Sequence, residues 1–168
     1  GWTIYVTGHS LGGALSTICA ADMAEKYPGC KVVNYNYGSP RVGNAPFVQG
    51  FNQAVPEAFR VVNDADVVAR VPRSRGFDYY HVGRTALVSR SGGGGRGSLW
   101  VEGESEGTDP LRDRWSNLSE LLDAEVAFLQ GLVKGESLGD HMEDAYYEAL
   151  QQALSAQKAL GAARGTLG

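Results

Sequence analysis

The sequence predicts an α/β fold with a mainly parallel sheet and flanking helices. In the first third of the chain, runs of β-branched and aromatic residues alternate with segments of helical periodicity, and most runs end at glycine or proline. The order strand, helix, strand, helix, strand requires parallel strands joined by right-handed crossovers. With 168 residues, 43% hydrophobic and 20% charged, the chain has the composition of one globular domain or a piece of one.

The elements follow in order from the first residues. We expect a buried strand at 2–6 ending at Gly8, a second strand at 31–37, a helix at 45–54 and a third strand at 58–62. Between the first two strands, apolar side chains recur at helical spacing until Pro28 and Gly29, and they predict a helix. The stripe on this helix consists of Leu11, Leu15, Ile18, Cys19 and Met23.

The second half of the chain has a looser pattern. Residues 79–82 and 85–89 resemble short edge strands, and a glycine-rich run at 91–97 is typical of a flexible linker. Two apolar helical stripes follow, one at Leu118, Leu121, Leu122, Val126, Leu129 and Leu132, the other at Met142, Tyr146, Leu150 and Leu154. The predicted organisation is a core at 1–90, a linker or insertion at 91–114 and a helical part at 115–168.

Charge and cysteine content exclude some classes of partner. The net charge of −4 is spread over mixed acidic and basic residues, which argues against nucleic-acid binding. Cys19 falls in the apolar helical stripe, so we expect it to be buried and unbridged, which favours an intracellular site such as cytosol or plastid. No apolar run reaches the ~20 residues of a membrane span. The chain opens directly on a strand, so we expect it to be cut from a longer protein.

The strongest chemical signal is a G-x-S-x-G pattern at Gly8, Ser10 and Gly12, placed between a predicted strand and a predicted helix. At such a sharp turn the serine backbone is strained, and the glycines on either side allow strand and helix to approach. The N–H of Leu11 then points to the space beside Ser10, where an oxyanion would form. We interpret Ser10 as a nucleophile; the alternative is a serine that only caps the helix.

A serine nucleophile needs a base, and the chain has three histidines. We assign the base to His141, in a loop entering the last helix. The alternatives are His9, expected to line the pocket or pack against the sheet, and His81, expected to be structural.

The base needs an acid to orient it. Asp66 directly follows the third strand, so its carboxylate is expected at the sheet edge that carries Ser10. Asp64 is the competitor, expected to be a solvated turn residue. The order Ser10, Asp66, His141 is the chain order of α/β-hydrolases.

Three segments of the sequence resemble a known family, the fungal-type or class 3 triacylglycerol lipases, which are also common in plants and algae. The resemblance is carried by VTGHSLGGAL at 6–15, YGSPRVGN at 37–44 and RVVNDADVV at 60–68. It implies an α/β-hydrolase fold, a triad aspartate at Asp66 and a structural role for His81. Around Asp140 and His141 it is local only.

The resemblance also implies features outside this chain. The family's early strands, lid helix and first oxyanion donor precede the nucleophile strand, so we expect the N-terminal strands to be missing here and these 168 residues alone to be weakly active or inactive.

The predicted function is hydrolysis of lipid acyl esters at a lipid–water interface, through an acyl-enzyme on Ser10 and without a metal or other cofactor. Two alternatives stay open: a catalytically silent lipase-like signalling module, and an esterase acting on a polar lipid or a small soluble ester.

Overall fold

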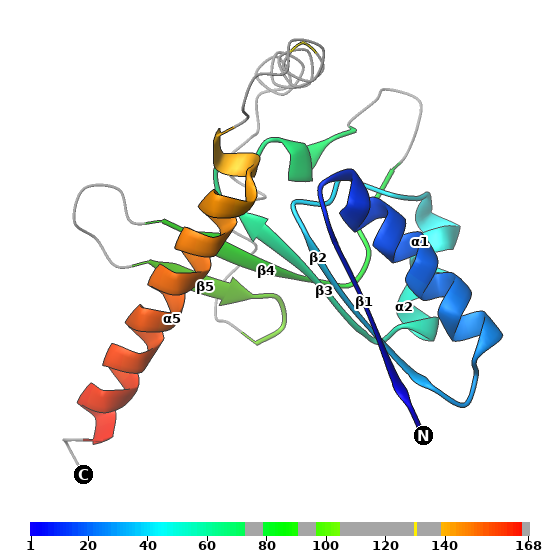
Figure 1. Ribbon diagram of the computed structural model, residues 1–168, viewed down its shortest axis with the longest axis horizontal. Helices are drawn as coiled ribbons and strands as arrows, with labels where there is room; N and C mark the ends of the chain where they lie inside the picture. Colours follow the sequence, from blue (N-terminus) through cyan, green and yellow to red (C-terminus); the bar gives the residue numbers. More distant parts are fainter. Residues whose placement is uncertain (73–78, 91–96, 105–129, 131–138, 166–168) are drawn as a thin grey trace.

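The computed structural model describes residues 1–72, 79–90, 97–104, 130 and 139–165 (Figure 1). Its centre is a five-stranded sheet in the order β1-β2-β3-β4-β5. The strands are β1 (Thr3–His9), β2 (Lys31–Tyr37), β3 (Glu57–Asn63), β4 (Arg84–Ser89) and β5 (Ser98–Val101). The first four are parallel, and β5 is antiparallel to β4. The predicted α/β class with a mainly parallel sheet is therefore confirmed.

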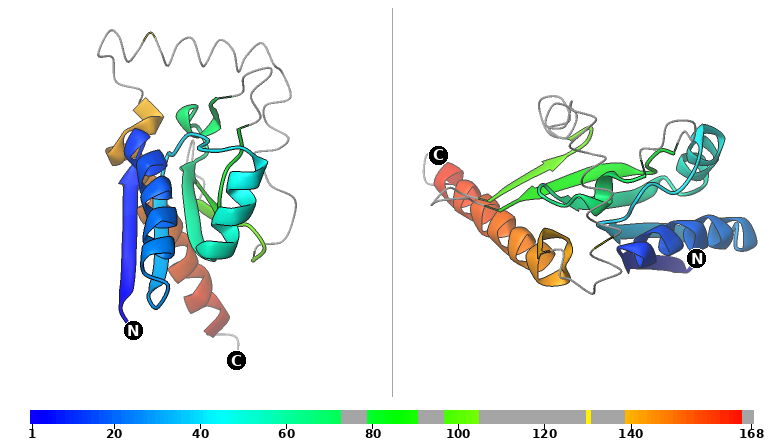
Figure 2. Two further views of the ribbon diagram at one scale, coloured as in Figure 1. Left: turned by 90° about the vertical axis from the view of Figure 1, so that its right-hand side faces the viewer. Right: turned by 90° about the horizontal axis from the view of Figure 1, so that it is seen from above.

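Helices cover both faces of the sheet, as Figure 2 shows from the side and from above. The helices α1 (Leu11–Lys26) and α2 (Ala45–Ala54) pack with β1, β2 and β3 around Ala20, Phe51 and Ala58. The long helix α5 (Glu143–Gly165) packs on the opposite face, where Tyr146 and Ala149 meet side chains of β3, β4 and β5. Two short 3₁₀ helices complete the described chain, η1 (Val68–Arg70) and η2 (Gly139–His141).

The orientation of α1 differs from the prediction. Most of its apolar stripe faces outward, with Leu11 67% and Leu15 58% exposed, and Cys19 is exposed rather than buried. Met23, at the end of the stripe, is partly buried and packs against the core. The buried face consists of Gly13, Ser16, Thr17 and Ala20. Small residues let the helix lie close to the sheet, and the hydroxyls meet two buried asparagine side chains of β2. Both cysteines are free, as expected.

Other differences concern the region after residue 76. The strand β4 lies inside the sheet between β3 and β5, and is not an edge. Residues 98–101, expected in a linker or insertion, form β5, which lies so close to α5 that a Cβ at Gly97 would meet Gln152. Residues 79–82 form no strand, only an isolated bridge between Tyr80 and Gly43. The predicted stripe from Leu118 to Leu132 lies outside the described residues.

Candidate active site

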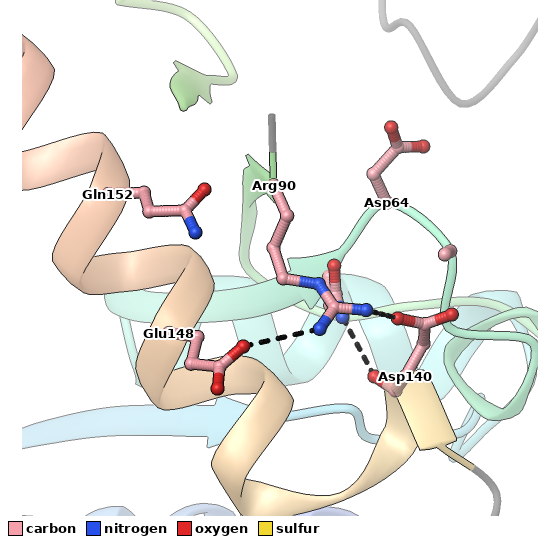
Figure 3. A pocket seen from close by; sticks show the side chains of 7 residues that line it. Asp64, Arg90, Asp140, Glu148 and Gln152 are labelled. Atoms are coloured by element: carbon pink, nitrogen blue, oxygen red, sulfur yellow. Dashed lines mark hydrogen bonds and ion pairs between the residues drawn. The ribbon is translucent and has the colours of Figure 1, made fainter. Parts of the chain in front are cut away.

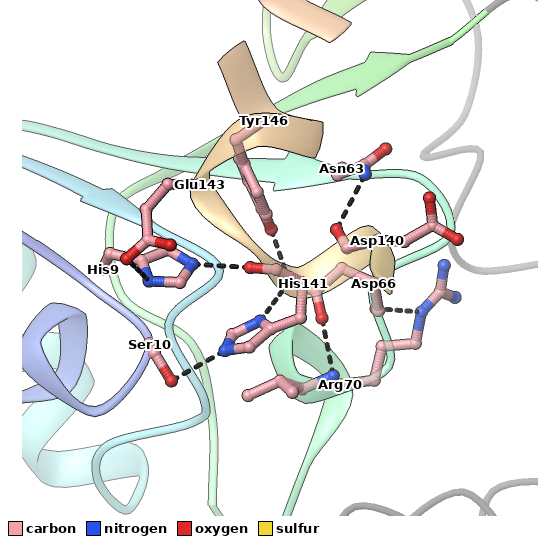
Figure 4. Close-up of polar contacts among 10 residues, drawn as sticks. His9, Ser10, Asn63, Asp66, Arg70, Asp140, His141, Glu143 and Tyr146 are labelled. Atoms are coloured by element: carbon pink, nitrogen blue, oxygen red, sulfur yellow. Dashed lines mark hydrogen bonds and ion pairs between the residues drawn. The ribbon is translucent and has the colours of Figure 1, made fainter. Parts of the chain in front are cut away.

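Polar side chains gather at one edge of the sheet because the carboxyl ends of parallel strands meet there. Ser10 follows β1, Gly38 follows β2, and Asp66 lies three residues beyond β3. The turn η2 brings His141 over the same edge before α5 begins (Figure 4). The residues that the sequence predicts as a triad are thus neighbours in space.

Ser10 occupies a sharp turn between β1 and α1. Its φ of 57° makes it the non-glycine residue with a positive φ in the described chain. Its N–H donates to the Tyr37 carbonyl at 2.9 Å, which ties the turn to β2. This strained turn between a strand and a helix is the nucleophile geometry of α/β-hydrolases.

The close approach predicted for the glycines around Ser10 is confirmed at Gly8 and at Gly13, but not at Gly12. A Cβ at Gly8 would collide with the Gly12 carbonyl, so this position requires glycine. A Cβ at Gly12, by contrast, meets nothing within 4 Å in the described part of the chain. The second close approach is at Gly13, where a Cβ would lie 2.9 Å from Ser39 Cβ. The contact between helix and sheet therefore depends on Gly8 and Gly13, not on Gly12.

His141 links the other two residues. Its Nε2 lies 2.7 Å from Ser10 Oγ, and its Nδ1 lies 3.0 Å from Asp66 Oδ2 (Figure 4). The Asp66 side chain is fully buried, and His141 is 4% exposed. A carboxylate accepts hydrogen bonds only, so Nδ1 carries the hydrogen and Nε2 is free to accept one from Ser10. This arrangement can draw a proton from the serine hydroxyl.

Asp66 is held by donors on both carboxylate oxygens. The Val68 N–H donates to Oδ1 at 2.8 Å, and the Tyr146 hydroxyl donates to Oδ2 at 2.5 Å. Burial, together with the adjacent Asp66 carboxylate, raises the pKa of Tyr146 far above its ordinary value, so the hydroxyl stays a donor. A buried carboxylate needs such partners, because an unsatisfied one is costly.

Tyr146→Phe is expected to lower the free energy of unfolding by about 1–3 kcal/mol, because Asp66 Oδ2 loses a buried hydrogen bond. Urea unfolding of the two proteins measures the difference. Tyr147→Phe is a matched control, since this neighbouring tyrosine is 65% exposed, and it should change stability by less than about 0.5 kcal/mol. Equal losses in both variants would contradict the role given to Tyr146.

Gly38 supplies the space in which the site assembles. Its φ is +58°, and a Cβ there would lie 2.8 Å from Asp66 Oδ2, 3.0 Å from Tyr146 Oη and 3.1 Å from His141 Cε1. Any side chain at this position would therefore displace the residues that contact one another. Gly38 is not among the site residues predicted from the sequence; its place at a strand's carboxyl end, opposite Ser10, is the signal that could have identified it.

The turn carrying His141 is fixed by polar contacts to the sheet. Asn63 Nδ2 donates to the Asp140 carbonyl at 2.8 Å. Arg90, just after β4, pairs with the side chains of Asp140 and Glu148 (Figure 3). These side chains line a polar pocket of about 390 Å³. Arg90 thus connects β4, η2 and α5, although it is not among the site residues predicted from the sequence.

The alternative residues occupy other positions. His81 lies beside Arg60 and Arg41; burial and the two cations hold the pKa of His81 well below its ordinary value. Asp64 lines the polar pocket, and its carbonyl accepts from Arg70. His9 contacts η2, where its Nε2 lies 2.7 Å from the His141 carbonyl oxygen.

The N–H of Leu11 lies at the first position of α1. The N–H groups of a helix's first turn have no acceptor within the helix, and they form the positive end of the helix dipole. The Ser10 carbonyl accepts from Gly13 and Ala14 further along. The start of α1 is therefore able to stabilise negative charge near Ser10 Oγ.

Residues 1–76 match the protein family Lipase (class 3). The resemblance to class 3 lipases is confirmed. A lipase of Caenorhabditis elegans is 47% identical over 75 residues, which are 42% of this chain and 21% of the relative. The chloroplastic phospholipase A1-Igamma1 of Arabidopsis thaliana is 44% identical over 77 residues, 42% of this chain and 15% of the relative.

Solved structures of lipases also match. The Rhizomucor miehei lipase propeptide complex is 32% identical to this chain, with a TM-score of 0.48 over 51% of this chain and 28% of the other. The lipase of the same organism, compared by sequence, is 35% identical over 91 residues, 52% of this chain and 25% of the relative. This chain thus spans about a fifth of the length of the lipases and the phospholipase it matches.

Metal-binding clusters and membrane-spanning helices are both absent from the described residues. Within the described ranges, no three histidine, cysteine or acidic side chains gather closely enough to hold a metal ion. In the same ranges, no helix has the length and hydropathy that crossing a membrane requires.

Proposed function

We propose that the protein carrying this chain hydrolyses acyl esters of lipids, with Ser10 as nucleophile, His141 as base and Asp66 as the acid that orients it. The observation that carries the proposal is the pair of contacts made by His141, 2.7 Å to Ser10 Oγ and 3.0 Å to Asp66 Oδ2. The membership of residues 1–76 in a lipase family supports the same reaction class. The triad chemistry itself requires no metal and no cofactor.

In the first half of the reaction, His141 Nε2 takes the Ser10 proton as Oγ attacks the ester carbonyl carbon. The tetrahedral oxyanion lies near the start of α1, where the Leu11 N–H donates to it. The protonated His141 then gives its proton to the leaving alcohol, and an acyl-enzyme on Ser10 remains. Asp66 stabilises the imidazolium throughout without taking its proton.

In the second half, water replaces the alcohol. His141 removes a proton from this water as its oxygen attacks the acyl carbon, and the proton passes to Ser10 Oγ as the fatty acid leaves. The enzyme returns to its starting protonation state, and one water molecule is consumed for each ester bond cleaved.

Lipid acyl esters are the substrate class that the relatives' names favour. The matched relatives include lipases, a mono- and diacylglycerol lipase and several phospholipases A1. These names agree in the bond cleaved, a carboxylic ester of a lipid, and differ in the rest of the molecule. We therefore assign the acyl ester to this site, at a lipid–water interface, and leave the head group open.

Labelling with a fluorophosphonate tests the proposal. This probe forms a bond only to a serine whose proton is removed by a base, so the intact protein should gain one adduct, located at Ser10 by peptide mass spectrometry. Ser10→Ala should abolish both labelling and ester hydrolysis. Ser16→Ala is a matched control, since Ser16 is buried in the helix that follows Ser10 and its hydroxyl contacts Gly13 and Asn34. Labelling retained in Ser10→Ala would overturn the assignment.

A further inference from the structure

His9 precedes the proposed nucleophile, yet the reaction above gives it no step. Its ring lies against the ring of His141, with centroids 4.7 Å apart and planes inclined by 31°. The edge of Tyr146 contacts it on another side, with centroids 5.7 Å apart. Figure 4 shows the His9 side chain turned toward η2 and the start of α5.

The contact between His9 and the backbone of His141 has a defined polarity. His9 Nε2 lies 2.7 Å from the His141 carbonyl oxygen, which can only accept. Nε2 of His9 therefore carries the hydrogen. The other ring nitrogen, Nδ1, lies 3.4 Å from Glu143 Oε1 at the first residue of α5. One side chain from the end of β1 thus reaches both η2 and α5.

This hydrogen bond acts on the residue whose ring is the proposed base. Both ring nitrogens of His141 contact partners, Ser10 and Asp66. The distances from the ring to these partners depend on where the backbone of His141 lies. His9, the last residue of β1, holds the carbonyl of that backbone, and Ser10 follows it directly. The same strand end therefore positions the nucleophile and fixes its distance from the base.

We propose that His9 is a positioning residue, which holds the backbone of His141 so that Nε2 stays within hydrogen-bond distance of Ser10 Oγ. The inference rests on the proposed function, since it assigns His9 to the same reaction. A displacement of a reacting group by about 1 Å can lower a rate about 100-fold, so the loss of this bond should be visible in kcat.

A pair of amide substitutions tests the bond itself. In His9→Gln the amide nitrogen can occupy the place of Nε2 and donate to the same carbonyl. In His9→Asn the side chain is one bond shorter, so its amide nitrogen takes the place of Nδ1 and does not reach the carbonyl. We expect His9→Asn to lower kcat by about 10- to 100-fold with KM changed less than about twofold, and His9→Gln to stay within about threefold of the wild type. Fluorophosphonate titration of each sample counts the active sites, so that misfolded protein does not enter kcat.

The outcomes separate the two proposals. Ser10→Ala is measured alongside: if it still hydrolyses ester, the proposed function fails whatever His9 does. If Ser10→Ala is inactive and the two His9 variants equal the wild type, or both lose kcat equally, or only KM changes, the proposed function stands and the positioning role is overturned. A purely structural role would lower the unfolding midpoint of both variants without the selective rescue of kcat by glutamine.

Discussion

Replacing His141 with alanine should lower kcat for ester hydrolysis by about 10⁶-fold, the scale found when a triad histidine is removed. The reason lies in the two contacts of this ring: without it, Ser10 Oγ loses its proton acceptor and Asp66 loses the group it orients. Because the residues act as a unit, Ser10→Ala and the double variant should be no worse than His141→Ala alone. Single-turnover kinetics with a chromogenic ester measures the loss.

His81→Gln is the control for this experiment. His81 lies beside Arg60 and Arg41 and has no step in the proposed reaction, so the variant should keep kcat per active site even if it loses stability. The comparison also tests the choice among the three histidines. If His81→Gln lost as much kcat per active site as His141→Ala, the assignment of the base would be wrong.

The sequence is sufficient to predict the carboxyl edge of the sheet. Short apolar strands ending at glycine or asparagine, separated by helices, fix a parallel order, and a parallel order places Ser10 and Asp66 at one edge. His141 is harder to place, because it approaches that edge from a turn that is distant in sequence. Its position depends on tertiary contacts of Asn63 and Arg90 with Asp140, which no local pattern predicts.

The orientation of α1 shows where periodicity alone fails. A helical stripe predicts which residues share a face, but not which face meets the sheet. Here Asn34 and Asn36 of β2 are buried and need hydrogen-bond partners, and Ser16 and Thr17 supply them. The face with these two hydroxyls therefore turns inward, and most of the apolar stripe turns outward.

The strand β5 could not be predicted from the sequence. With four residues next to a glycine-rich run, β5 has too weak a local signal to be recognised, and it depends on pairing with β4 and on the close approach of α5 at Gly97.

The role of Tyr146 could not be predicted either. Tyr146 fits an apolar helical stripe, and only its hydroxyl distinguishes it from a core phenylalanine. A buried tyrosine hydroxyl usually has a polar partner, and here that partner is Asp66.

Asp66→Asn should lower kcat by about 10⁴-fold while the protein stays folded. The Val68 N–H requires an acceptor at the position of Oδ1, so the asparagine oxygen takes that position and its amide NH₂ faces His141 Nδ1. Facing a donor, Nδ1 gives up its hydrogen and Nε2 carries one instead. A protonated Nε2 donates to Ser10 Oγ and can no longer take its proton, so the side chains stay in place while the tautomer is wrong.

Asp64→Asn is the matched control, because it makes the same change two residues away and preserves the Asp64 carbonyl that accepts from Arg70. It should keep kcat within about twofold of the wild type, as expected for a side chain outside the reacting groups. Urea unfolding of both variants separates loss of catalysis from loss of fold. If Asp64→Asn were the more damaging change, the acid would have been assigned to the wrong carboxylate, and the tautomer of His141 would be set by a contact other than the one to Asp66.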